Sequence, residues 1–157
     1  MGFNISRQRL YASLLILGAG FLLFRTIMML SQGSLNVFVS WVSILLIAEF
    51  LIDLGCLLSS TFWWISNDKN KASIPLRFAA AVIIVHAMRV LVFVLGRVGP
   101  WVDFDVRPEH RALHNTRWSW TGVYFAAIMS VLSICVLIIV WRLRRRARKK
   151  SLTNPPL

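Results

Sequence analysis

Four long apolar stretches constrain this chain more than any other feature of its sequence. They cover residues 10–30, 37–64, 76–95 and 120–141. Each reaches the ~20 residues that a helix needs to cross the hydrocarbon core of a bilayer. The second stretch is longer than required, which indicates tilt or an interfacial end. The sequence therefore predicts an all-α integral membrane protein with four transmembrane helices.

The composition agrees with this prediction. Hydrophobic residues make up 57% of the 157 residues, and the mean hydropathy is +0.67. Charged residues make up only 15%, whereas soluble domains carry about 25%. This leaves room for one transmembrane domain, residues 1–142, followed by a basic tail at 143–157.

The net charge of +12 is explained by membrane topology, and we do not predict a nucleic-acid partner. Twelve of the 18 Lys and Arg residues fall at the N-terminus, around the second connection and in the C-terminal tail. By the positive-inside rule, both termini are cytoplasmic and the larger loop between the third and fourth helices is extracytoplasmic. All seven Trp residues lie near predicted helix ends, as expected at a membrane interface. We expect a multi-pass plasma-membrane protein, by default of the bacterial inner membrane.

Apart from Arg77 at the start of the third stretch, five Asp, Glu, His or Arg residues lie inside the first three apolar stretches. They are Arg25, Glu49, Asp53, His86 and Arg89. A charge in hydrocarbon costs at least ~2.5 kcal/mol, so such residues normally face one another or a wet cavity. Their charges sum to zero if the histidine is neutral. The rise per residue, counted from the helix ends, gives the depth of each residue in the membrane. These depths predict that Glu49 reaches Arg89 and that Asp53 reaches His86. Arg25 is then the charge whose depth is least well matched by a partner.

Three interpretations of this buried charge network stay open. It can be structural, fixing helix packing within one chain or between subunits. Arg25 and Arg89 can instead bind an anion, such as a lipid phosphate or a carboxylate. In the third interpretation, His86 and the neighbouring carboxylates relay protons.

The connection from residue 96 to about 119 holds the second candidate site. Pro108 can open a short helix that places His110 and His114 on one face, at a spacing that suits metal ligation. Asp103, Asp105 or Glu109 can supply oxygen ligands. No third ligand is fixed by spacing, so no metal or cofactor is predicted. The alternative is an interfacial loop anchored by tryptophans and arginines.

The C-terminal tail is predicted to bind anionic headgroups at the cytoplasmic surface, at ~1 kcal/mol per charge. Its basic cluster directly follows the fourth stretch. The cluster consists of Arg142, Arg144, Arg145, Arg146, Arg148, Lys149 and Lys150.

The chain carries no P-loop, GxSxG or HExxH motif. With no complete catalytic set, we expect a small non-catalytic subunit or accessory protein of a larger membrane complex. Its expected partners are membrane lipids and other membrane subunits, or further copies of itself. The alternative is a membrane-embedded enzyme or carrier that handles an anionic lipid-like substrate at the extracytoplasmic face. In that case Arg25 and Arg89 hold the anion, and His110, His114 or Glu49 moves protons.

Overall fold

The computed structural model describes residues 7–96 and 99–112, together with residues 131, 134, 138, 141, 142 and 145. These residues form helices, turns and one isolated β-bridge, and no strand occurs among them. Three helices are long and apolar enough to cross a membrane: α1 (Arg7–Ser31), α3 (Ser40–Ser66) and α4 (Ser73–Leu95). They confirm the first three predicted stretches as helices of a membrane protein. The fourth stretch, 120–141, lies outside the described residues apart from a few isolated positions.

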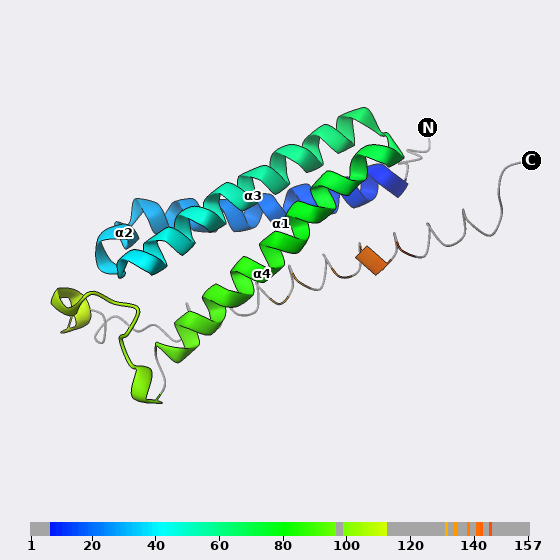
Figure 1. Ribbon diagram of the computed structural model, residues 1–157. Helices are drawn as coiled ribbons and strands as arrows, with labels where there is room; N and C mark the ends of the chain where they lie inside the picture. Colours follow the sequence, from blue (N-terminus) through cyan, green and yellow to red (C-terminus); the bar gives the residue numbers. More distant parts are fainter. Residues whose placement is uncertain are drawn as a thin grey trace, which may run out of the picture.

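The three long helices pack in sequence order, with α3 lying against both α1 and α4 (Figure 1). Short connections make neighbouring helices antiparallel. The turn at Gly33, which has φ of 77°, leads into the one-turn helix α2 (Ser34–Val37). At the opposite end, the 3-10 helix η1 (Lys69–Ala72) joins α3 to α4. In Figure 1, α4 diverges from α1 and α3 toward its C-terminal end.

The predicted second stretch is divided in the structure. It was expected to run from residue 37, but α3 begins at Ser40 because Phe38 and Val39 are extended. The extra length at this end therefore does not form a continuous helix. It forms a short extended segment that pairs with a distant part of the chain.

An apolar core fills the half of the bundle nearest the N-terminus of α1. Apart from Trp63, it is built from small and medium-sized residues, which allow the helices to approach closely. Gly55 shows how close this approach is, because the ring of Phe78 occupies the space that a Cβ atom there would need. The buried core consists of Ala12, Leu15, Ala19, Leu22, Cys56, Trp63, Ala72, Ala79 and Val82.

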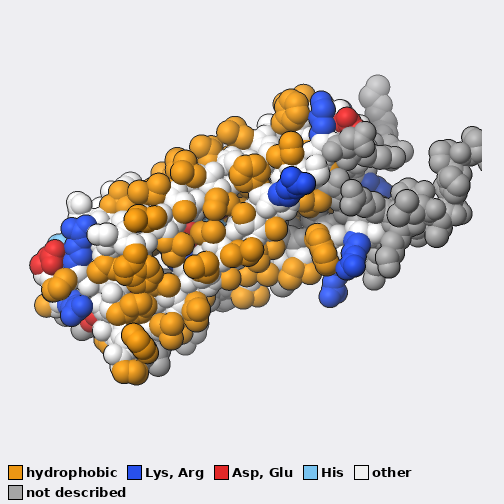
Figure 2. Space-filling model, viewed as in Figure 1, with side chains coloured by type: hydrophobic (Ala, Val, Ile, Leu, Met, Phe, Trp, Pro, Cys, Tyr) orange, Lys and Arg blue, Asp and Glu red, His pale blue; other side chains and the backbone are white. Residues whose placement is uncertain are grey.

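The outer surface of the bundle is suited to hydrocarbon. Large side chains such as Leu17, Ile44 and Ile84 are at least 60% exposed. Figure 2 shows hydrophobic side chains over most of one face, with Lys, Arg, Asp and Glu gathered toward the two ends. A monomeric soluble protein rarely exposes so much contiguous apolar area.

The segment 99–112 folds back over the end of the bundle where α2 meets α3 (Figure 1). It contains the 3-10 helices η2 (Gly99–Trp101) and η3 (Pro108–His110), with a β-bridge between Phe38 and Val106. The amide of Val39 donates to the Asp105 carbonyl at 3.0 Å, and the Arg107 amide donates to the Val37 carbonyl at 3.0 Å. Since Val106 is fully buried, this segment is a packed cap.

Candidate functional site: a buried charge network

Helix α3 contributes both acidic residues of the network. Glu49 and Asp53 are four residues apart, so they lie on one face of the helix, and both are fully buried. The same face continues through Cys56 and Ser60, which are also buried. The polar stripe that the sequence contains is therefore turned inward along its whole length.

Helix α4 supplies the partners of these two carboxylates. His86 Nε2 lies 3.0 Å from Asp53 Oδ1 and 3.1 Å from Asp53 Oδ2. Arg89 Nη1 donates to Glu49 Oε2 and forms an ion pair with it. Both basic residues are buried, with 4% and 9% exposure. The structure thus brings together the two pairs that counting the helical rise had suggested.

His86 also joins the two pairs into one network. Its other ring nitrogen, Nδ1, lies 3.7 Å from Glu49 Oε1. That oxygen is buried and accepts no hydrogen bond from the residues that the structure describes. One imidazole therefore faces a carboxylate on each side, which the sequence did not specify.

Helix α1 closes the site on its third side. Arg89 Nη2 contacts the thioether sulfur of Met29. Arg25 is half-buried at the edge of the inward face of α1, and it interacts electrostatically with Arg89, Glu49 and Asp53. The Met29 contact carried no recognisable sequence signal, because an apolar side chain within a membrane span does not stand out.

The network lies between the apolar core and the cap. On α1 the network residues lie between the core residues and the helix end at Ser31. On α4 they lie between the core residues and the helix end at Leu95, which precedes the cap. Taking one charge out of water costs several kcal/mol, which is offset only by good pairing. With His86 neutral, the four groups on α3 and α4 sum to −1, and Arg25 brings the total to zero.

The candidates in the segment 99–112 are not brought together. Asp103 and Asp105 are buried, with the Asp105 carboxylate against Gly96, whereas Glu109 is exposed and His110 is half-buried on η3. Among the described residues, no group of three or more His, Cys, Asp or Glu side chains could hold a metal ion. His114 lies outside the described residues.

Aromatic packing, rather than metal ligation, organises this cap. Trp41 stacks on Phe104 with ring centroids 5.6 Å apart, and Trp101 meets Phe104 edge-on at 6.1 Å. The Arg107 guanidinium donates from Nε to the Phe38 carbonyl at 2.9 Å and from Nη2 to the Leu35 carbonyl at 3.3 Å. Arg107, one of the arginines that the interfacial interpretation of this loop uses as an anchor, thus binds backbone carbonyls.

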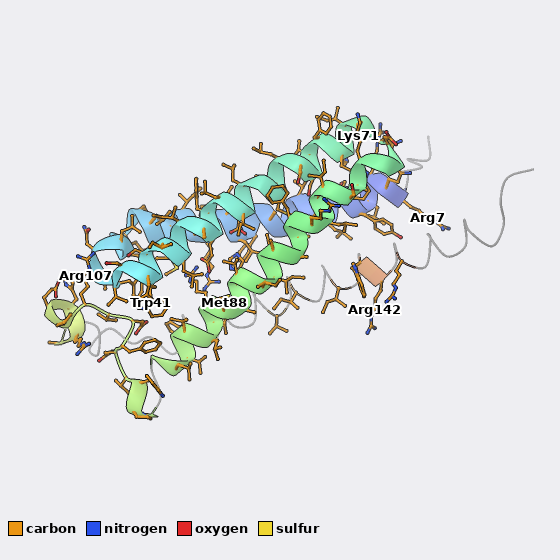
Figure 3. The ribbon with its side chains drawn as sticks, in the orientation of Figure 1. Arg7, Trp41, Lys71, Met88, Arg107 and Arg142 are labelled. Atoms are coloured by element: carbon orange, nitrogen blue, oxygen red, sulfur yellow. The ribbon has the colours of Figure 1, made fainter. Side chains whose placement is uncertain are left out.

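Of the predicted lipid-binding tail, the structure describes only Arg142 and Arg145. The Arg145 guanidinium lies over the Trp141 ring, 5.3 Å from its centroid. The other members of the basic cluster lie outside the described residues. Figure 3 places Arg7, Lys71 and Arg142 toward one end of the molecule, and Trp41 and Arg107 toward the other.

The network has three chemical capacities: it can lock helix packing, hold a proton between acceptors, or offer positive charge to an anion. Arg89 is hydrogen-bonded to Glu49 and His86 to Asp53, and hydrogen bonds to an ionised partner are stronger than those between neutral groups. No protein-family model, curated protein or solved structure matches the chain.

Proposed function

We propose that this protein is a multi-pass, non-catalytic subunit or accessory protein of a larger membrane complex. The observation that carries the proposal is the mutual pairing of the buried charges. Glu49 is paired with Arg89 and Asp53 with His86, all within the bundle. Charges that are engaged with each other fix the register of two helices, which is the best-attested use of buried ionic groups.

Two further observations support an assembly role. Apolar side chains cover the long helices. In the most apolar 18-residue segment of each helix, at most 28% of the residues are buried within the chain. The remaining surface is available to lipid and to the helices of other subunits. The cap formed by 99–112 adds a shaped surface at one end.

The proposed topology is four spanning helices with both termini in the cytoplasm of a bacterial cell and the cap outside. It is supported by Arg7, Lys71 and Arg142, which lie toward one end of the molecule (Figure 3). The segments that contain them carry most of the Lys and Arg residues. The positive-inside rule assigns that end to the cytoplasm.

The test compares two acidic substitutions in tagged protein extracted gently from its native membrane. Glu49→Leu removes a fully buried partner of Arg89, while Glu109→Gln changes an exposed acidic residue. We expect the unaltered chain and the Glu109→Gln control to migrate with a second protein at fixed stoichiometry, and Glu49→Leu to lose it. Migration of all three as the same single-chain particle contradicts the subunit role.

A second function is favoured by one specific observation. Among the described residues, Arg25, His86 and Arg89 gather three side chains able to carry positive charge around Glu49 and Asp53. Arginine at the edge of such a cluster suits an anionic lipid-like substrate handled by an enzyme or carrier. This second function predicts that the purified protein retains an anionic lipid. Arg25→Gln is expected to release the lipid, whereas the control Arg111→Gln, at an exposed position of the cap, is expected to retain it. Equal lipid content in all three proteins contradicts it.

A further inference from the structure

His86 poses a hydrogen-bonding problem that its neighbours do not solve. A neutral imidazole carries one N–H and one lone pair. Here Nε2 faces both oxygens of Asp53 at 3.0 and 3.1 Å, so the N–H belongs there. Nδ1 then carries the lone pair, and Glu49 Oε1, which lies 3.7 Å from Nδ1, has only lone pairs when ionised.

Two lone pairs facing each other in a buried site are repulsive, and a proton between them removes the repulsion. The 3.7 Å separation is too short for a bridging water, which needs about 5.5 Å between two groups that it bonds at ordinary distances. It is only about half an ångström longer than a direct N–H···O bond. A small movement of either side chain closes the gap once a proton is present.

One added proton balances the four groups on α3 and α4, and Arg25 of α1 then brings the five groups to +1. With the proton added, Glu49, Asp53, His86 and Arg89 sum to zero without help from another helix. Without it they sum to −1, and neutrality depends on Arg25 of α1, which is only half-buried. The remaining neighbour from α1, Met29, contributes no charge.

We infer that His86 and Glu49 form a proton-binding site that holds one proton more than a neutral imidazole beside an ionised carboxylate. The proton is taken from water and lies on His86 Nδ1 or on Glu49 Oε1, and no other bond forms or breaks. The site is independent of the proposed subunit role, since it rests on side chains within one chain.

The experiment isolates the two residues spectroscopically. His110→Gln, His114→Gln and Glu109→Gln are combined, which leaves His86 as the only histidine and Glu49 as the only glutamate. The protein, labelled with ¹⁵N-histidine and ¹³C-carboxyl glutamate, is studied by NMR in nanodiscs at neutral pH. We expect either an imidazolium with both ring nitrogens protonated, or a neutral imidazole together with a protonated Glu49 carboxyl.

A neutral imidazole beside an ionised Glu49 overturns the inference, whichever ring nitrogen carries the hydrogen. Glu109 and His110 lie on η3, outside the network. His86 ring signals that match those of the unaltered protein verify that the three substitutions preserve the site.

Discussion

At the residue scale, the network shows why charged residues can lie inside membrane-spanning helices. Each carboxylate of α3 meets a basic group of α4, and His86 links the two pairs. The pairing could be predicted from depth, because helical rise fixes how far each residue lies from its helix end. The bridging position of His86 and the contact of Arg89 with Met29 could not, because both depend on side-chain conformation and helix rotation.

A double-mutant cycle tests the Glu49–Arg89 pair. Glu49→Leu or Arg89→Leu alone leaves the other charge buried without its partner, and we expect each to destabilise the protein by about 3–5 kcal/mol. The double substitution removes both charges and is expected to cost less than the sum of the two. The measurement is the free energy of unfolding in mild detergent. Additive losses would show that the two side chains do not interact.

At the element scale, the three long helices were predictable because hydropathy is local and each stretch exceeds a bilayer span. The cap was not. Val37 and the extended residues Phe38 and Val39 pair with 105–107, nearly seventy residues away, and neither segment carries an alternating strand pattern. The packing of Trp41 on Phe104 follows from the same long-range contact. Sequence reasoning placed the aromatic residues at the interface but gave no partner for them.

The close approach of α3 and α4 can be tested at Gly55. A Cβ atom there meets the Phe78 ring, so Gly55→Ala forces the ring or the helix to move. We expect a loss of about 1–3 kcal/mol in the free energy of unfolding, typical of overpacking. Combining it with Phe78→Leu, which removes the obstructing ring atoms, is expected to recover part of the loss. If the combination is more harmful than both single changes added together, the two residues do not compete for one space.

The docking of the cap can be tested through Arg107. Its guanidinium donates to the Phe38 and Leu35 carbonyls, and hydrogen bonds from charged groups contribute roughly 1.5–3 kcal/mol. Arg107→Gln should therefore speed hydrogen exchange at the Val39 amide on the order of tenfold, since this amide bonds to the cap. The exposed Arg111→Gln is the control and should leave the exchange rate unchanged. Equal rates in both variants would mean that Arg107 does not hold the cap.

At the scale of the whole molecule, the described residues form a thin bundle with a polar interior and an apolar exterior. In the most apolar segment of each long helix at most 28% of the residues are buried, so most of these residues stay at least partly exposed to lipid or another protein. Function could not be predicted beyond this, because buried ion pairs have the same appearance in a sequence whether they lock packing or serve chemistry. The mutual pairing in the structure is what favours an assembly role.

The most direct test of that role is the mass of the intact particle, measured by native mass spectrometry after transfer from the native membrane into nanodiscs. The account predicts a complex in which this chain is present with a second membrane protein at fixed stoichiometry. A particle that contains only this chain and a tightly held anionic lipid would contradict the subunit role and favour the enzyme or carrier.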